Sequence, residues 1–258
     1  MIFIIGGNGY VGQAYRRLFD KLGRSYQIIT RDNYASFAGQ SCELLINANG
    51  NSRKFVADRD PISEFDASVT SVVRSLEAFP AERYVLLSSG DVYPRQETPE
   101  MTREDALLDT TAMSRYGLHK CLAETIVRSL HPNHLIIRMG GFVGPGMKKN
   151  AIFDLLNDQP IWLDRESRLQ FISTDTAAGL VWSLVERREV RNETVNLGAV
   201  GTVRIGDLYD RVAPASDYHP DARHVIFEIS TDKLALLVGH DLPTSEQEVD
   251  AFLAGHGR

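Results

Sequence analysis

A glycine-rich turn near the amino terminus constrains the fold of this chain more than any other feature. The apolar run MIFII ends at Gly6, and Gly9 and Gly12 follow at three-residue intervals before a segment with helical periodicity. Glycine permits a tight turn and a close approach of the backbone to a pyrophosphate, which then meets the positive end of a helix. The order of strand, turn and helix therefore predicts a dinucleotide-binding site at the start of the chain.

Apolar segments of two kinds alternate along most of the sequence. Five further runs have strand character, at residues 26–30, 43–48, 84–88, 134–139 and 193–197. Segments with apolar side chains three and four residues apart lie at residues 11–22, 62–79, 115–130 and 174–185. Strands that alternate with helices form a parallel sheet with helices on both faces. We therefore expect an α/β fold, a Rossmann-type doubly wound parallel sheet with a small C-terminal substrate-binding cap.

The character of the chain changes after residue 139, where a glycine-rich loop begins and the following segments become shorter and more polar. We assign residues 1–145 and 171–200 to a dinucleotide-binding Rossmann domain, and residues 146–170 and 201–258 to the cap. Beyond residue 201 we expect short helices and one strand, at residues 224–229. Open α/β folds bind their ligands at the carboxyl edge of the sheet, where such a cap would stand.

Bulk composition argues against several classes of partner. The 258 residues carry a net charge of −6, whereas a nucleic-acid surface needs a basic excess. No apolar run reaches the length of a membrane span. Cys42 and Cys121 lack metal-ligand spacing, so we expect reduced, buried thiols and no metal site. Because the first strand is expected to begin at Met1, we expect no signal peptide and a cytoplasmic protein.

The end of the second predicted strand bears on the choice of cofactor. A carboxylate there binds the ribose 2′-OH of NAD, whereas an arginine accommodates the 2′-phosphate of NADP. The sequence has Thr30, Arg31 and Asp32 at this point. Arg31 favours NADP, and Asp32 leaves NAD open. Further cofactor contacts are expected from the glycine turn and from the end of the third strand, at Tyr10, Val11, Asn47, Ala48 and Asn49.

Tyr116 and Lys120 lie four residues apart on a predicted helix, so their side chains share one face. A free tyrosine has a pKa of about 10, which a nearby ammonium and an oxidised nicotinamide would lower. Tyr116 could then exchange a proton with an alcohol or a ketone while hydride moves. Ser89 follows a predicted strand upstream and could hydrogen-bond the substrate oxygen.

Taken together, these features resemble the extended short-chain dehydrogenase/reductases, in particular the NAD-dependent epimerase/dehydratase group. The resemblance covers nearly the whole chain. Beside the glycine turn, the matching segments are residues 88–93, the Y-x-x-x-K-x-x-x-E of Tyr116, Lys120 and Glu124, residues 138–146, residues 171–177 and residues 196–198. The resemblance implies that Ser89, Tyr116 and Lys120 are the catalytic residues, with Tyr116 and Lys120 also contacting the cofactor.

The chain departs from this family in three respects. Gly141 stands where the group has an asparagine, so a usual contact is missing. Dehydratases of the group carry two adjacent acidic residues after the catalytic hydroxyl, and here these positions are Gly90 and Asp91. The missing first acid argues against water elimination, which needs a proton donor for the departing hydroxyl. The cap is also short, which leaves open a homodimer in which a second chain completes the pocket.

The resemblance implies a small-molecule substrate, commonly a sugar nucleotide. A diphosphate needs cationic partners. The candidate substrate contacts are Asp91, Lys148, Lys149, Arg165 and Arg168. We expect an NAD(P)-dependent oxidoreductase that reduces or oxidises a carbonyl or alcohol through acid/base catalysis by Tyr116 and hydride transfer. Two alternatives stay open: an epimerase that retains its NAD, and a non-catalytic NADP-binding regulator.

Overall fold

The computed structural model describes residues 1–50 and 54–256. The chain forms two compact units, each assembled from three stretches. The first unit comprises Met1–Pro94, Leu107–Met139 and Ala178–Val195, and the second comprises Arg95–Ala106, Gly140–Ala177 and Asn196–Arg258. None of the helices in the described part of the chain has the length and apolarity needed to cross a bilayer.

A six-stranded sheet forms the centre of the first unit. Its strands are β1 (Ile2–Ile5), β2 (Tyr26–Ile29), β3 (Cys42–Asn47), β4 (Ala81–Ser89), β5 (His134–Met139) and β10 (Glu193–Leu197), in the spatial order β10-β5-β4-β3-β1-β2. The pairs β1–β2, β1–β3, β3–β4 and β4–β5 are parallel. Because β1 stands between β2 and β3, the strand order reverses beside it, as in doubly wound folds. The predicted α/β fold class is confirmed.

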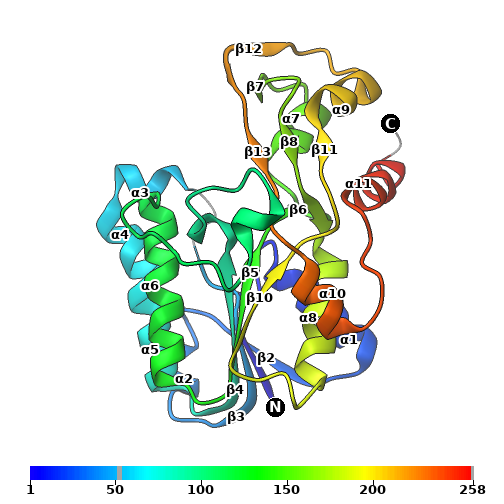
Figure 1. Ribbon diagram of the computed structural model, residues 1–258. Coiled ribbons are helices and arrows are strands. Elements are labelled where there is room, and N and C mark those ends of the chain that lie inside the picture. Colours follow the sequence, from blue (N-terminus) through cyan, green and yellow to red (C-terminus); the bar gives the residue numbers. More distant parts are fainter. Residues whose placement is uncertain (51–53, 257–258) are drawn as a thin grey trace. The chain divides into compact units, whose positions relative to one another are not determined.

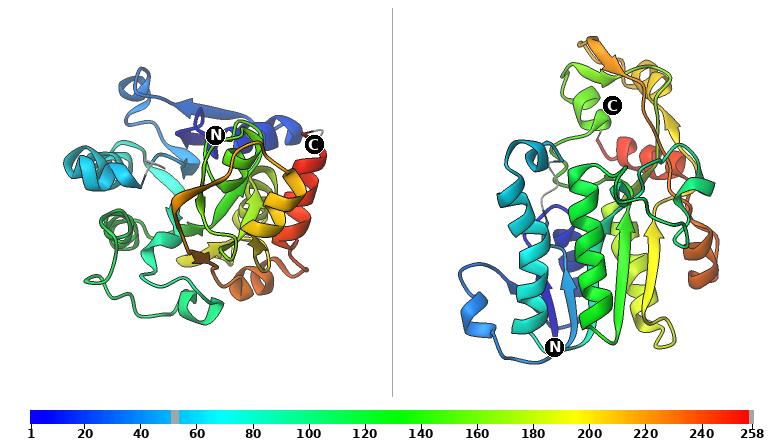
Figure 2. Two further views of the ribbon diagram at one scale, coloured as in Figure 1. Left: turned by 90° about the horizontal axis from the view of Figure 1, so that it is seen from above. Right: turned by 60° about the vertical axis from the view of Figure 1, so that its left-hand side comes forward.

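Helices cover both faces of this sheet (Figure 1). On one face lie α1 (Gly12–Leu22) and the part of α8 (Thr174–Glu186) that belongs to the first unit. Here Phe19 meets Trp182 with ring centroids 5.1 Å apart. On the other face, α5 (Ser71–Ala78) and α6 (Arg115–Leu130) lie side by side (Figure 2). Shorter elements of this unit are α2 (Tyr34–Phe37), α3 (Phe55–Arg59), α4 (Pro61–Phe65), the π-helical turn η1 (Asp66–Thr70) and the 3₁₀ turn η2 (Gly90–Val92).

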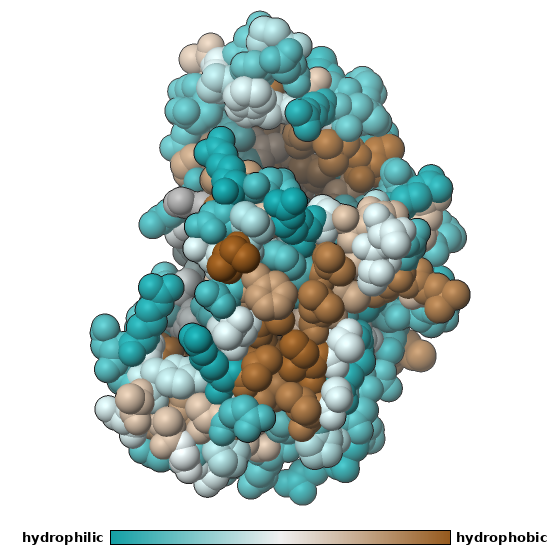
Figure 3. Space-filling view, turned by 90° about the vertical axis from the view of Figure 1, so that its left-hand side faces the viewer, coloured by the Kyte–Doolittle hydropathy of each residue, from teal (hydrophilic) through white to brown (hydrophobic). Residues whose placement is uncertain are grey.

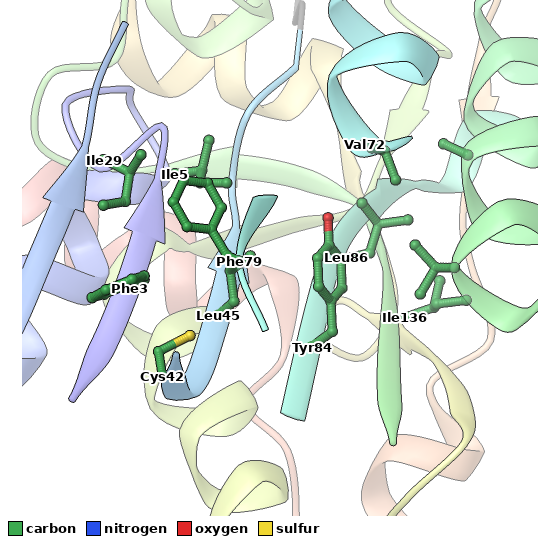
Figure 4. Packing of buried hydrophobic residues seen from close by; sticks show 12 residues of the cluster. Phe3, Ile5, Ile29, Cys42, Leu45, Val72, Phe79, Tyr84, Leu86 and Ile136 are labelled. Carbon is green, nitrogen blue, oxygen red and sulfur yellow. The ribbon is translucent and has the colours of Figure 1, made fainter. Parts of the chain in front are cut away.

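Apolar side chains between the sheet and the α5–α6 layer form a core (Figure 4). The sheet, the two helices and the adjoining loop contribute Phe3, Ile5, Ile29, Cys42, Leu45, Val72, Phe79, Tyr84, Leu86, Ala123, Val127 and Ile136. The hydroxyl of Tyr84 is satisfied inside this core, since Asn47 Nδ2 donates to it at 2.7 Å. Burial raises the pKa of Tyr84 to about 12. Cys42 and Cys121 are free and buried, as expected.

Arg83 ties β4 to the end of α8. Its side chain is only 7% exposed, and its guanidinium donates to the carbonyl of Val185 at 2.8 Å and also to the carbonyl of Val190. Because the last carbonyls of a helix have no partner within the helix, Arg83 gives the carbonyl of Val185 a hydrogen-bond donor.

The helix predicted at residues 62–79 is found as an unbroken run of α4, η1 and α5 that contains a π-helical turn. α4 ends at Phe65, the π-helical turn η1 follows, and α5 begins at Ser71. The hydroxyl of Ser71 donates back to the carbonyl of Ala67 at 2.6 Å. Such side-chain bonds compete with the regular backbone pattern of a helix. Apolar spacing alone predicts the helix and not the π-helical turn within it.

The second unit contains three small sheets. Its strands are β6 (Gly141–Val143), β7 (Ile161–Leu163), β8 (Arg168–Leu169), β9 (Phe171–Ser173), β11 (Val203–Arg204), β12 (Tyr218–Arg223) and β13 (Ile226–Phe227). They pair as β11-β8-β13, β12-β7 and β6-β9. Its helices are the 3₁₀ turn η3 (Pro99–Thr102), α7 (Ala151–Leu156), α9 (Ile205–Val212), α10 (Asp232–Val238) and α11 (Ser245–Ala254).

The strand predicted at residues 224–229 is found as the shorter β13, but it is not the one strand beyond residue 201, because the structure adds β11 and β12. β12 has the sequence YHPDAR, whose exposed polar residues give no apolar alternation. Its pairing depends on β7, where Tyr218 stands opposite Ile161. A long-range partner, rather than a local pattern, defines this strand.

Candidate active site

The glycine turn joins β1 to α1 in a compact arrangement. Gly6 has a φ of +76°, in the left-handed region that favours glycine, and its carbonyl accepts a hydrogen bond from the N–H of Gly9 at 2.8 Å. A Cβ atom on Gly12 would lie 2.2 Å from that same carbonyl oxygen, so a side chain does not fit there. No side chain caps the start of α1, and the positive end of the helix dipole faces the turn. The turn has the shape that a pyrophosphate site needs.

The loops that follow β1, β2 and β3 meet at one edge of the sheet, because these strands pair in parallel. Arg31 and Asp32 follow β2, and both are exposed. A Cβ atom on Gly6 would come within 2.8 Å of the carbonyl oxygen of Ala48. The loop after β3 therefore packs directly on the glycine turn, within which Tyr10 also lies.

Asn47 is buried at the end of β3, and its side chain shapes the loop that carries Ala48 and Asn49. Its Oδ1 accepts the N–H of Asn49 at 3.0 Å, and its Nδ2 donates to the hydroxyl of Tyr84. At the other side of the turn, Val11 occupies the N-cap position of α1. These residues hold the backbone around the turn in place.

Tyr116 and Lys120 are buried on one face of α6, one helical turn apart. The helix begins after Ser114, whose hydroxyl accepts the N–H of Gly117 at 3.1 Å. Lys120 Nζ lies 5.8 Å from the centroid of the Tyr116 ring. A Cβ atom on Gly50 would stand 2.8 Å from Lys120 Nζ, so the ammonium lies against the loop after β3. Lys120 thus lies between Tyr116 and the edge that carries the glycine turn.

Ser89 ends β4 beside this pair, and a chain of hydrogen bonds continues outward from it. Its hydroxyl donates to Asp91 Oδ2 at 2.8 Å. Asp91 Oδ1 accepts a bond from Lys54 Nζ at 2.6 Å. A Cβ atom on Gly117 would lie 2.1 Å from the carbonyl oxygen of Asp91, so α6 approaches the η2 turn closely at that glycine. This contact brings Ser89 and Tyr116 together.

The electrostatic environment opposes ionisation of both candidate catalytic groups. Burial raises the pKa of Tyr116, the carboxylates of Asp91 and Glu64 raise it further, and a hydrogen bond with Ser89 lowers it. Burial lowers the pKa of Lys120, while the carboxylates of Glu64, Glu124 and Asp91 raise it. Desolvation dominates in each case, because a charge in the protein interior loses its hydration.

A buried ion pair holds α6 against the sheet. The Glu124 side chain is fully buried and accepts hydrogen bonds from Ser88 Oγ of β4 at 2.6 Å and from Arg138 Nη2 of β5 at 2.8 Å. Arg128 Nη2, on the more exposed side of α6, donates to the same carboxylate at 2.6 Å. Arg138 Nη1 also donates to the hydroxyl of Tyr93 at 2.8 Å. Side chains of both β4 and β5 therefore hold α6, the helix that carries Tyr116 and Lys120, against the sheet.

Sequence reasoning missed two residues at this site, Glu64 and His119. His119 falls inside the Y-x-x-x-K interval, and its buried position could have been found from its spacing of three residues from Tyr116. Glu64 lies on α4, and its carboxylate hydrogen-bonds His119 Nδ1. No local pattern indicates that contact, since 55 residues separate the two side chains.

The candidate diphosphate contacts lie in the second unit. Lys148 and Lys149 are exposed between β6 and α7, and Arg168 is exposed on β8. Arg165 Nη2 pairs with Asp210 Oδ2 at 2.5 Å. Its guanidinium also lies 5.7 Å from the centroid of the Tyr209 ring. These four cations are therefore spread over separate elements of the unit, and Arg165 already has a counter-ion.

Packing explains why Gly141 stands in place of the asparagine of the family pattern. A Cβ atom there would lie 2.6 Å from the carbonyl oxygen of Gln170. It would also lie 3.1 Å from the ring of Phe171. β6 and β9 pair at this point, so a side chain would push the two strands apart.

Comparison with known proteins assigns the chain to a family. The sequence profile of the NAD dependent epimerase/dehydratase family matches residues 2–198. The chain belongs to this family. The matched region contains the glycine turn, Ser89, Tyr116 and Lys120. No curated protein has a sequence that matches this epimerase/dehydratase-family chain significantly.

Solved structures share the fold of this family member at low sequence identity. UDP-galactose 4-epimerase is 18% identical with a TM-score of 0.79, and the alignment covers 99% of each chain. MoeE5 in complex with UDP-glucuronic acid and NAD is 16% identical with a TM-score of 0.82, over 97% of this chain and 96% of that one. RMD from Pseudomonas aeruginosa, complexed with NADPH, is 17% identical with a TM-score of 0.78, over 98% of this chain and 99% of that one.

The Glu124–Arg138 pair gives a testable prediction for stability. Glu124→Gln should reduce the free energy of unfolding by about 3–5 kcal/mol, because it leaves Arg138 as an uncompensated buried charge. Arg128→Met is the matched control: it removes an exposed partner of the same carboxylate and should cost at most about 1 kcal/mol. Urea unfolding followed by circular dichroism measures both. Equal losses in the two variants would contradict the role given to Arg138.

Proposed function

We propose that this protein is an NAD(P)-dependent oxidoreductase that reduces or oxidises a carbonyl or alcohol on a sugar nucleotide. One observation carries the proposal: Tyr116 and Lys120 are buried on one face of α6, with the Lys120 ammonium against the loop at Gly50. That loop packs on the glycine turn through Ala48. An acid–base group therefore lies next to the edge at which a dinucleotide would bind.

The proposed reaction uses each residue for a separate task. A bound nicotinamide would supply or accept the hydride. In the reducing direction, the Tyr116 hydroxyl gives its proton to the carbonyl oxygen as hydride reaches the carbon, which yields the alcohol. The Ser89 hydroxyl, which donates to Asp91 Oδ2 in this structure, would turn to donate a hydrogen bond to the same oxygen and stabilise its developing negative charge. The Lys120 ammonium favours the phenolate that Tyr116 becomes.

The substrate class is inferred from structural neighbours. MoeE5 is seen in complexes with UDP-glucuronic acid and with UDP-glucose. In this chain Asp91 would contact the substrate beside Ser89. The exposed cations Lys148, Lys149 and Arg168, together with Arg165, are the proposed contacts for a diphosphate in the second unit.

An epimerase is the second candidate, because the similar fold of UDP-galactose 4-epimerase covers the whole chain. An epimerase of this kind would return the hydride to its substrate and keep its dinucleotide through purification. Denaturing the purified protein and weighing any released dinucleotide by mass spectrometry separates the two candidates. Retained NAD favours the epimerase, whereas empty protein that binds NADPH reversibly favours the reductase.

The proposed acid–base role of Tyr116 is tested by Tyr116→Phe. This variant should still bind the dinucleotide, but its turnover should fall by roughly a hundredfold or more, the scale expected for loss of a general acid–base. Absorbance of NAD(P)H with a panel of UDP-sugars and their 4-keto forms measures turnover. Tyr26→Phe, which removes an exposed hydroxyl bonded to Asp20, is the control. Near-normal turnover of Tyr116→Phe would reject the mechanism.

We propose that NADP is the preferred cofactor, with Arg31 binding its 2′-phosphate. Among the structural neighbours, RMD is seen with NADPH and MoeE5 with NAD. Arg31→Ala should weaken NADPH binding by roughly ten- to a hundredfold, the value of a charge-assisted hydrogen bond, and leave NADH almost unchanged. Fluorescence titration measures both affinities. Arg24→Ala, at the opposite end of β2, is the control. A parent protein that prefers NADH would instead favour Asp32 as the ribose ligand.

We also propose a homodimer formed through the α4–α6 side of the first unit. Figure 3 looks onto this side, where hydrophobic side chains gather. The exposed apolar residues of these helices are Ile62, Phe65, Leu122 and Leu130. These residues are the proposed contacts between the two copies.

Ile62→Asp tests the dimer, since a carboxylate in an apolar interface is costly to desolvate. The variant should be monomeric by light scattering at a concentration where the parent is a dimer. Leu107→Asp introduces the same charge at a fully exposed apolar position outside these helices and should leave the mass unchanged. A monomeric parent protein would rule out the dimer.

A further inference from the structure

A pocket of about 750 Å³ lies at the amino edge of the central sheet, within the first unit. Its lining includes Ile2 at the start of β1, Leu44 of β3 and Arg83 of β4, and Trp182 of α8 also borders it. The amino terminus lies at this edge (Figure 1). The glycine turn and the end of β4 lie at the opposite edge, because the strands are parallel. The pocket is therefore separate from the proposed active site, and its volume is that of a small-molecule site.

Positive groups outnumber carboxylates in the lining of this pocket by five to three, although the chain as a whole has a net charge of −6. Two of the positive groups are paired at the surface. The amino terminus binds Glu43 at 2.8 Å, and Arg24 lies 3.6 Å from Glu186. Three arginines and one carboxylate of the lining stand outside these two pairs.

The three arginines outside the pairs are Arg83, Arg188 and Arg191, and the carboxylate is Glu82. Arg191 Nε donates to the carbonyl of Arg188 at 3.1 Å, so these two residues are neighbours. Burial lowers the pKa of Arg83, the charge of Arg191 lowers it further, and the charge of Glu189 raises it. Guanidinium groups that are close enough to repel one another favour an anion between them.

Two polar atoms beside the pocket have no hydrogen-bond partner in the described part of the chain. They are Arg83 Nε, a donor, and Asn133 Oδ1, an acceptor, and both residues line the pocket. Arg83 is 7% exposed, and its other nitrogens donate to neutral main-chain carbonyls. Buried polar atoms in proteins are normally paired. A small shift of either side chain toward the pocket would let a ligand with both acceptor and donor groups satisfy them.

We propose that this pocket binds a small hydroxylated phosphate ester, the chemical class of the sugar phosphates. The phosphate lies among Arg83, Arg188 and Arg191, since guanidinium groups match phosphate oxygens in charge and geometry. Three such groups favour a doubly charged phosphate over a carboxylate. Asn133 Oδ1 and the Glu82 carboxylate accept hydrogen bonds from the hydroxyl groups. The inference goes beyond the proposed function and does not depend on it.

Tryptophan fluorescence tests the site directly. The chain has two tryptophans, so Trp162→Phe leaves Trp182, which lines the pocket, as the only one. In this background, glucose 1-phosphate should change the emission of Trp182 in a saturable way, with a Kd of about 1 mM or lower. Inorganic phosphate, which lacks the hydroxyl groups, should bind more weakly, and glucose should not bind. No saturable change up to about 10 mM glucose 1-phosphate, or equally tight binding of inorganic phosphate, would overturn the proposal.

Arginine variants in the same background assign the binding to this pocket. Arg188→Gln and Arg191→Gln, both at exposed positions, should each weaken glucose 1-phosphate binding roughly tenfold through loss of a charge-assisted hydrogen bond. Arg74→Gln removes the same charge from an exposed position on α5 and should leave the affinity unchanged. An affinity that neither pocket variant lowers, or that Arg74→Gln lowers equally, would reject the site.

Two further results keep this inference distinct from the proposed function. Tyr116→Phe should bind glucose 1-phosphate as tightly as the parent, because Tyr116 lies outside the pocket; weaker binding would place the ligand in the proposed active site and overturn the inference. A protein that binds glucose 1-phosphate through Arg188 and Arg191 but binds neither NADPH nor NADH would overturn the proposed function and support the inference.

Discussion

Tyr116, Lys120 and Glu124 form a polar stripe on the buried face of α6, and the rest of the site compensates for the hydration that these side chains lose. A helix that turns Tyr116, Lys120 and Glu124 toward the interior must find partners for two charges, because an unpaired buried charge is very costly. Arg138 of β5 meets the Glu124 carboxylate, and neighbouring carboxylates raise the pKa of Lys120. The position of the candidate catalytic residues therefore follows from how the buried charges of one helix are balanced.

Local patterns predict the elements on which this balance is built. The sequence predicts the bounds of α6 and β5 to the residue, since the helix has apolar periodicity and the strand is a continuous apolar run. The π-helical turn within the helix at residues 62–79 and the polar strand β12 were missed, because side-chain bonds and a distant strand decide them. The same limit applies to Glu64, whose partner His119 lies on another helix.

Within the candidate site, glycines mark where backbones approach most closely. The turn at Gly12 belongs to the family pattern and could be recognised from spacing alone. Gly117 and Gly50 could not be, because the groups that exclude a side chain there are the carbonyl of Asp91 and the ammonium of Lys120. Gly141 is a further case, in which a departure from the family pattern is a requirement of strand pairing with β9.

The contact between Phe19 and Trp182 has a consequence for how the protein is made. The two rings meet across α1 and α8, yet one is near the start of the chain and the other belongs to the last stretch of the first unit. During synthesis, the apolar face of α1 stays uncovered until α8 has left the ribosome, when most of the polypeptide has been made. Arg83 of β4, a strand that is made much earlier, then binds carbonyls at the end of α8 and holds this helix against the sheet.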